Sequence, residues 1–280
     1  MHGDIEVIDP DLSRYARDGA RPLPPADTQG HVEHDGARIW YGTYGSGSPV
    51  LLLHGGLGNA ENWGYQVPAL IETGHRVVLI DSRGHGRSTQ DAAPLSYELM
   101  ASDVLAVMDA IAVEQAAFVG WSDGAILSLI MAMKHAERVS RVFAFAGPMD
   151  PSGNKPISPA DEPILGRIFG RHAKDYARLS STPAEFKAFS GAISKLMESE
   201  PNYGAGDLAQ IRAPTAIVDG EYDEFLRREH IDYLAATIPG ATLVILPRVT
   251  HFAPLQRPSV FNRAMLSFLD SNLEAGRRGC

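Results

Sequence analysis

The sequence predicts an α/β fold, a mostly parallel eight-stranded sheet with helices on both faces and a helical cap insertion. Short apolar runs, typical of strands buried on both faces, alternate with segments of helical periodicity from residue 31 onward. The alternation stops between residues 148 and 207, where helical pieces replace the strands, and then resumes. Alternating strands and helices imply parallel strands joined by right-handed crossovers.

The expected elements follow the chain in order. The first two strands form a hairpin around an Asp35-Gly36 turn, and the later strands read as short apolar runs. The expected strands are 31–34, 37–44, 49–53, 76–80, 116–119, 139–146, 214–218 and 241–246. The expected helices of the core are 60–72, 96–111, 125–133, 227–238 and 258–273.

Three regions are expected. Residues 1–30 form an N-terminal arm, polar and proline-bearing, with one short helix near 12–17. Residues 31–147 and 208–280 form the core, and 148–207 form the helical cap.

Two helices are predicted within the cap, over residues 163–179 and 184–198. The second begins with Thr182 as N-cap, Pro183 at the first helical position and Glu185 completing a capping box.

Composition excludes several classes of protein. A chain of 280 residues with 44% hydrophobic and 21% charged residues is ordinary globular material. Its net charge of -9 argues against nucleic acid as a partner, because phosphate binding requires a basic surface. The single cysteine, Cys280, allows neither an intramolecular disulfide nor a multi-cysteine metal site. No apolar run has the length of a membrane span and no signal peptide is evident, so we expect a cytoplasmic protein without membrane partners.

The central motif is Gly-Trp-Ser-Asp-Gly, residues 120–124, between an apolar run and an apolar helical segment. Gly-x-Ser-x-Gly at a strand-to-helix junction is typical of a nucleophile elbow, in which a tight turn projects the serine hydroxyl above the sheet. The motif alone is weak evidence, and the strand before it and the helix after it strengthen it. Ser122 is therefore the candidate nucleophile.

A serine nucleophile needs a base and an acid, which on this kind of sheet follow in the order Ser, Asp/Glu, His. His251 lies just beyond the last strand, and Asp223 just beyond the strand before it. Site loops of parallel sheets gather at such strand ends. We therefore expect His251 as base, although most of the ten histidines of the chain are expected to be solvated or packed in the core.

We expect Asp223 as acid, because Gly220 allows the turn that directs it toward His251. The alternatives for the acid are Asp219, Glu221 and Glu224, and a plain helix-start carboxylate is the alternative role for Asp223.

The loop His54-Gly55-Gly56-Leu57 follows the third strand, where backbone N–H groups would face a developing oxyanion. Gly56, or alternatively Leu57, would supply one donor and Asp123 the other. The competing interpretation is a plain glycine turn.

Together these motifs resemble the α/β-hydrolase superfamily, specifically serine esterases with a helical cap, over residues 31–273. The resemblance also includes Asp81–Ser88 after the fourth strand, which in that superfamily is mostly structural, so His85 is not expected to be catalytic. A serine at the elbow argues against haloalkane dehalogenase or epoxide hydrolase chemistry. The resemblance implies cleavage of a carboxylic ester or lactone through an acyl-enzyme, with no metal or organic cofactor.

The Gly-Trp-Ser-Asp-Gly motif resembles that of valacyclovir-hydrolase-like esterases. The chain also resembles, more faintly, the macrolide esterases that confer antibiotic resistance. In the former, the acid after the serine recognises the ammonium of an amino-acid ester, and Asp123 occupies that position. A carboxylate in the first turn of a helix is also stabilised by the dipole, by roughly 0.3–1 kcal/mol, and this is the alternative role.

The expected substrate pocket includes Leu57, Trp63, Trp121, Asp123 and Met149. The cap face of Phe186, Phe189 and Ile193 either forms its roof or packs on the sheet. The expected partner is a small-molecule ester or lactone. Both a monomer and a small homo-oligomer remain open. The alternative functions are a hydrolase of carbon–carbon bonds in ring-cleavage products, a cofactor-free perhydrolase, and a hydrolase-like receptor that binds its ligand.

Overall fold

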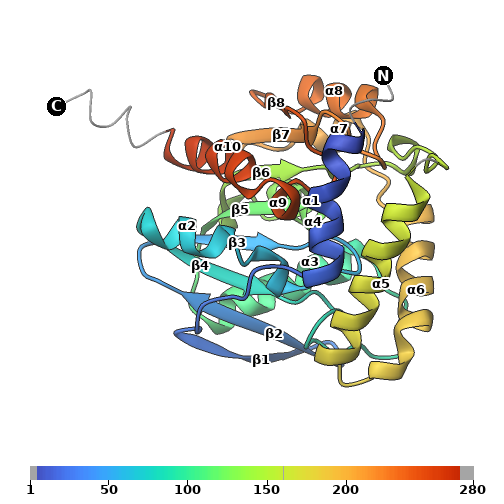
Figure 1. Cartoon of the computed structure of the whole chain (residues 1–280). Helices are drawn as coiled ribbons and strands as arrows, with labels where there is room; N and C mark the ends of the chain where they lie inside the picture. The colour runs from blue at the N-terminus through green and yellow to red at the C-terminus, as the bar shows by residue number, and fades with distance from the viewer. Residues whose placement is uncertain (1–4, 160, 272–280) are drawn as a thin grey trace.

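The computed structural model describes residues 5–159 and 161–271 and contains one sheet of eight strands (Figure 1). Its strand order is β1-β2-β4-β3-β5-β6-β7-β8. The strands are β1 (Thr28–His34), β2 (Ala37–Tyr44), β3 (Ser48–Leu53), β4 (His75–Ile80), β5 (Ala116–Trp121), β6 (Val139–Phe145), β7 (Thr215–Gly220) and β8 (Thr242–Leu246). The predicted fold class and all eight strands are confirmed, with ends shifted by a few residues at most.

The sheet is parallel except at one strand. β2 pairs antiparallel with both β1 and β4, whereas every other neighbouring pair is parallel. At the centre, β5 is buried along its whole length and β3 from Val50 to Leu53, because helices cover both faces. The carboxyl ends of the central strands therefore converge on one edge of the sheet.

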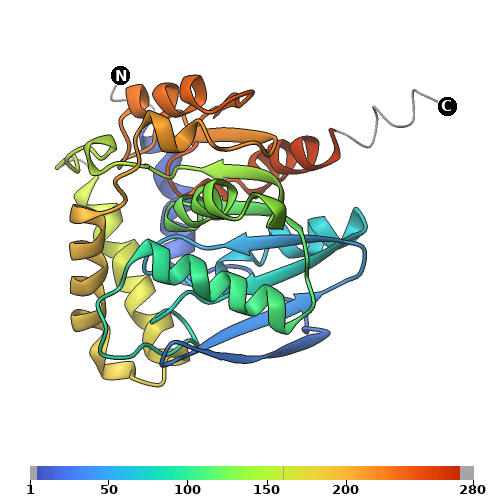
Figure 2. The same cartoon turned by 180° about the vertical axis from the view of Figure 1, so that it is seen from behind.

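Helices cover both faces of the sheet. α2 (Gln66–Glu72) and α10 (Pro258–Asp270) lie on the face seen in Figure 1, whereas α3 (Tyr97–Ala110) and α4 (Asp123–Lys134) lie on the face seen in Figure 2. α8 (Arg228–Thr237) packs on β7 and β8. α4 follows β5 directly and is buried along nearly its whole length, which fixes its N-terminus rigidly above the strand end.

The segment between β6 and β7 is helical. It contains the short 3₁₀ turns η3 (Pro151–Gly153) and η4 (Pro183–Glu185), and the helices α5 (Glu162–Leu179), α6 (Phe186–Ser199) and α7 (Ala205–Leu208). α5 and α6 lie side by side at one end of the sheet (Figure 1).

The predicted capping box at Thr182 is wrong. Thr182 Oγ1 lies 3.0 Å from the hydroxyl of Tyr176 and 3.2 Å from that of Ser180, and no side-chain cap bond forms. Pro183 and Glu185 form a 3₁₀ turn before α6 begins.

The N-terminal arm holds more structure than its sequence indicates. Helix α1 (Ile5–Asp18) has 14 residues, whereas only a short helix near 12–17 is expected from the sequence. It packs on α5 of the cap and on α9 (Ala253–Gln256) of the core, burying Leu12 and Tyr15. The arm therefore bridges the cap and the core.

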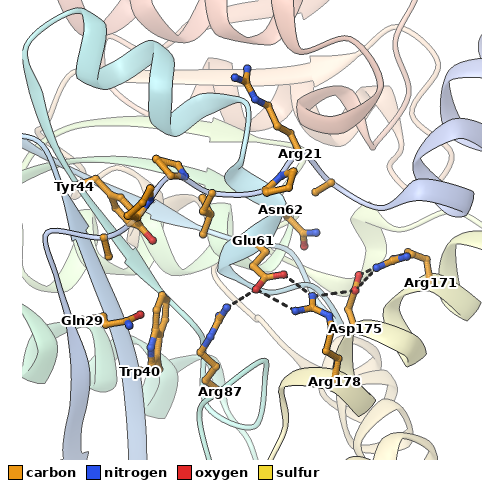
Figure 3. A pocket seen from close by; sticks show the side chains of 16 residues that line it. Arg21, Gln29, Trp40, Tyr44, Glu61, Asn62, Arg87, Arg171, Asp175 and Arg178 are labelled. Atoms are coloured by element: carbon orange, nitrogen blue, oxygen red, sulfur yellow. Dashed lines mark hydrogen bonds and ion pairs between the residues drawn. The ribbon is translucent and has the colours of Figure 1, made fainter.

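A chain of ion pairs also joins cap and core, beside a cavity of about 500 Å³ under the arm (Figure 3). Arg178 of α5 binds Glu61 of η1 (Ala60–Trp63) at 2.5 Å, and Arg87 binds the same carboxylate. On the cap side, Asp175 is paired with both Arg171 and Arg178, at 2.5 and 3.2 Å. Each acid thus lies between two arginines, and the network holds α5 against the core.

In the part of the chain that the structure describes, no helix is both long enough and apolar enough to cross a membrane. Cys280 and the predicted end of the last helix at residue 273 lie outside the described residues.

Candidate active site

Ser122 lies on a strained turn between β5 and α4. Its backbone has φ 56° and ψ -117°, a region that residues with a side chain rarely adopt, and its N–H donates to Phe145 O at 2.8 Å. The flanking glycines make the turn possible: a Cβ at Gly120 would lie 2.1 Å from Gly124 O, and one at Gly124 would lie 1.9 Å from Leu53 O. Both glycines are therefore sterically required at the predicted elbow.

His251 and Asp223 are joined at the ends of the last two strands. The ring Nδ1 of His251 lies 2.7 Å from Asp223 Oδ2. Because a carboxylate only accepts, the ring proton lies on Nδ1, and Nε2 is left with the lone pair that a general base needs. Asp223 Oδ1 accepts the N–H groups of Phe225 and Leu226 at 2.7 and 2.8 Å, which fixes the carboxylate in the turn after β7.

The two groups stabilise each other's charged forms. Burial alone would lower the pKa of His251, but the Asp223 carboxylate outweighs it and the pKa lies above its usual value. Burial would likewise raise the pKa of Asp223, and the His251 ring and two backbone donors hold it below its usual value. The neighbouring Asp219 behaves oppositely, because burial and then the Asp223 charge raise its pKa. Asp219 therefore carries a proton where Asp223 does not.

The loop after β3 packs closely against the elbow. A Cβ at Gly55 would lie 3.1 Å from Ser122 Cβ, and one at Gly56 would lie 2.8 Å from Asp123 Oδ2. His54 holds this loop by accepting Ser82 N–H at its Nε2, 3.0 Å away. Asp123 is the first residue of α4, where backbone N–H groups have no partner within the helix. The two proposed oxyanion segments thus lie together beside Ser122.

A cavity of about 720 Å³ opens over Ser122 and His251, within the size range of sites for drug-sized ligands. Of the predicted pocket residues, Leu57, Trp121 and Asp123 line it. Trp63 and Met149 do not, which runs against their prediction as substrate contacts. Trp63 is fully buried against Trp121 and Phe261, and Met149 is fully buried. Both follow strands that lead to the site, but their side chains pack in the core.

The cap closes the cavity with α6. Ile193 and Met197 line it, and a Cβ at Gly56 would lie only 2.4 Å from Met197 Cε. Phe189 instead packs on the rings of Tyr176 and His85, at 4.9 and 4.7 Å between centroids. The cap face therefore lines the cavity through Ile193, as one of the two alternatives expected, whereas Phe189 packs on α5 and on the loop after β4.

Asp123 is a buried carboxylate with one oxygen unused. Its Oδ1 accepts the hydroxyl of Tyr97 at 2.9 Å, whereas Oδ2 has no hydrogen-bond partner among the described residues. Burial raises the pKa of Asp123 to about 6. The residue is only 3% exposed, and it is one of those that line the cavity.

The sequence reasoning missed the neighbours of Asp123. Tyr97 begins α3 and donates its backbone N–H to Glu200 Oε2 at 3.1 Å, while its hydroxyl holds Asp123. Glu198 and Glu200, at the end of α6, also line the cavity. No sequence signal connects these residues, because Asp123 lies 26 positions and Glu200 lies 103 positions from Tyr97 along the chain.

His85 lies away from the chemistry. Its ring is buried between His54 and Phe189, and burial lowers its pKa to about 3, so it is neutral. No group of three or more His, Cys, Asp or Glu side chains that could hold a metal ion occurs within residues 5–159 and 161–271.

Comparisons with known proteins agree with this architecture. The model of the alpha/beta hydrolase fold family matches residues 48–179. Serine hydrolase BPHL of Mus musculus is 28% identical over 94% of this chain and 94% of that protein. A 2-hydroxy-6-oxo-6-phenylhexa-2,4-dienoate hydrolase of Burkholderia cepacia is 26% identical over 83% and 91%.

Among solved structures, Est816, described as an N-acyl homoserine lactone degrading enzyme, has a TM-score of 0.68 and 31% identity, covering 85% of this chain and 100% of that chain. The first two relatives are named as hydrolases, and the substrates named for the second and for Est816 differ. The chain is therefore a hydrolase that belongs to the α/β-hydrolase family.

Proposed function

We propose that this chain is a serine hydrolase that cleaves a carboxylic ester or lactone through an acyl-enzyme. The observation that carries the proposal is the joint placement of Ser122, on a strained elbow, and the His251–Asp223 pair around one cavity. His251 Nε2 takes the proton of Ser122 as the hydroxyl attacks the carbonyl, and Asp223 stabilises the imidazolium that forms. The N–H groups of Gly56 and Asp123 bind the oxyanion. The imidazolium gives the proton of Ser122 to the alcohol oxygen of the substrate as the C–O bond breaks and the acyl-enzyme forms. Neutral His251 then takes a proton from the water that attacks the acyl-enzyme, and returns it to Ser122 as the acid is released.

We further propose that the substrate carries a basic amine, as an amino-acid ester or a macrolide lactone does. Asp123 Oδ2 is buried without a partner among the described residues, and an unsatisfied buried carboxylate oxygen is costly unless a ligand pairs with it. Glu198 and Glu200 bring two more carboxylates to the same cavity, and Lys155 is the one lysine among the described residues that line it. An ammonium group would thus find the charge it requires close to the nucleophile.

The test is kcat/KM for matched substrates with wild type and Asp123→Asn. The panel contains α-amino-acid esters, the same esters without the amino group, neutral p-nitrophenyl esters and a 16-membered macrolide. A charged hydrogen bond contributes about 1.5–3 kcal/mol, so we expect the variant to lose roughly tenfold or more on the cationic substrates alone. The preference should also fade below pH 6, where Asp123 is protonated.

Equal losses on the amino and the desamino esters would contradict the ammonium role and leave Asp123 as an oxyanion and helix-start residue.

Hydrolysis of a carbon–carbon bond is the second candidate reaction, because the relative of Burkholderia cepacia is named for a ring-cleavage product. A vinylogous diketone of that type belongs in the panel, and carbon–carbon scission with no ester hydrolysis would replace the present proposal.

A further inference from the structure

His251 is held at two places by two neighbouring residues. Its ring contacts Asp223, and its backbone N–H donates to Glu224 Oε2 at 2.8 Å. Glu224 is only 7% exposed, so its carboxylate is a buried group beside the proposed base. The mechanism described above uses Asp223 and leaves Glu224 without a role.

In the loop that carries the base, residues 247–252 (the histidine loop), several backbone N–H groups donate to side chains. Arg248 N–H donates to Glu221 and Thr250 N–H to Gln256, each at 2.8 Å. Glu221 is exposed and Gln256 is neutral. Of these acceptors, Glu224 is therefore the one that brings a buried carboxylate to the base itself.

We propose that Glu224 is a positioning residue for His251, fixing its backbone through the N–H bond and favouring the imidazolium through its charge. The inference rests on the role of His251 as general base. It assigns the pair Asp223–Glu224 a joint task, in which one carboxylate orients the ring and the next anchors the main chain.

The electrostatic surroundings support this division. Burial, followed by the Asp223 charge, raises the pKa of Glu224 to about 7, and the ionised carboxylate in turn raises the pKa of His251. Removing that charge lowers the pKa of His251, so the acidic limb of kcat/KM should move to lower pH. The other charged or titratable groups of this cluster are Asp123, Lys155, Asp219 and Asp223.

Two substitutions separate the two contributions. In Glu224→Gln the side-chain oxygen still accepts the His251 N–H, but the charge is gone. In Glu224→Ala both are lost, and a buried N–H without an acceptor is strongly disfavoured, so the histidine loop should shift. Glu221→Gln is the matched control, because it alters an exposed carboxylate that accepts the N–H of Arg248 in the same loop.

The measurements are kcat and KM across pH with a p-nitrophenyl ester, and the titration of His251 by NMR, assigned with His251→Ala. We expect Glu224→Gln to keep kcat within a few-fold at pH 8 and to shift both the acidic limb and the His251 titration downward. Glu224→Ala should lower kcat roughly tenfold or more with little change in KM, in a protein of native circular dichroism. Glu221→Gln should match wild type in both.

Glu224→Gln with an unshifted His251 titration would overturn the inference, as would a shift of equal size in Glu221→Gln. If Glu224→Ala does not fold, the glutamine variant still decides. The NMR readout does not require turnover. An inactive wild type with a shifted titration in Glu224→Gln would therefore contradict the proposed function while leaving the electrostatic role of Glu224 in place.

Discussion

At the scale of single residues, Asp123 contributes a buried carboxylate to the site and lowers the stability of the folded chain. Its carboxylate is buried, accepts one hydrogen bond from Tyr97, and leaves the second oxygen without a partner among the described residues. An acid whose pKa is raised from 3.8 to about 6 on folding binds its proton more tightly in the folded chain. Stability therefore falls as the pH rises from the unfolded pKa to the folded pKa, and stays lower above it.

Asp123→Asn should accordingly make the protein more stable at neutral and alkaline pH. The asparagine oxygen can still accept the Tyr97 hydroxyl, and no charge is buried. We expect a gain of about 1–3 kcal/mol at pH 8 that shrinks toward zero near pH 3, below the unfolded pKa of 3.8, because Asp123 is then protonated in both the folded and the unfolded chain. Urea unfolding at the two pH values measures it, with the exposed Glu229→Gln as control. A variant less stable than wild type at pH 8 would show that the carboxylate has a partner that stabilises it.

Some of the site residues could be predicted from the sequence and others could not. Ser122, Asp223 and His251 follow strand ends in a fixed order, so their convergence could be expected from position alone. Trp63 follows the same topology yet points into the core, since strand order does not specify the direction of a side chain. The contact between Glu224 and the His251 N–H depends on the path of two loops, which local pattern does not encode.

At the scale of elements, the elbow and the cap respond differently to the same substitution. A Cβ at Gly120 would lie 2.1 Å from a backbone oxygen, which cannot move without displacing α4, whereas a Cβ at Gly191 of α6 would meet nothing within 4 Å. Gly120→Ala should therefore destabilise by about 4 kcal/mol or more, or prevent soluble expression. Gly191→Ala should stabilise by roughly 0.5–1 kcal/mol, since alanine is the better helix former.

Thermal unfolding of both variants tests this comparison. A Gly120→Ala protein with native stability and full activity would mean that the turn at Ser122 is looser than the geometry requires. Gly166 of α5, which is also free of neighbours within 4 Å, provides a second site at which alanine should be tolerated.

Elements that depend on tertiary contacts were the ones that sequence reasoning described poorly. α1 contains Pro10 and has a polar composition, and the burial of Leu12 and Tyr15 against α5 supports it instead. Thr182 matches a capping box by spacing, but its hydroxyl lies within hydrogen-bonding distance of Tyr176 in the preceding helix. In both cases a contact with another helix outweighs the local preference.

At the scale of the whole molecule, the fold was predictable because strand and helix periodicities alternate clearly around a buried parallel sheet. The substrate was not, because its selectivity depends on cap side chains such as Met197 and Glu200 that carry no motif. The two relatives whose names include a substrate also name different ones. The central claim is therefore the chemistry of Ser122, which is independent of the substrate.

The most direct measurement of that claim is labelling with a fluorophosphonate, followed by peptide mass spectrometry. The account predicts one label per chain on Ser122, loss of ester hydrolysis in proportion to labelling, and no label and no turnover in a folded Ser122→Ala protein. Labelling at another residue, or a Ser122→Ala protein that hydrolyses esters at near wild-type rate, would contradict the account.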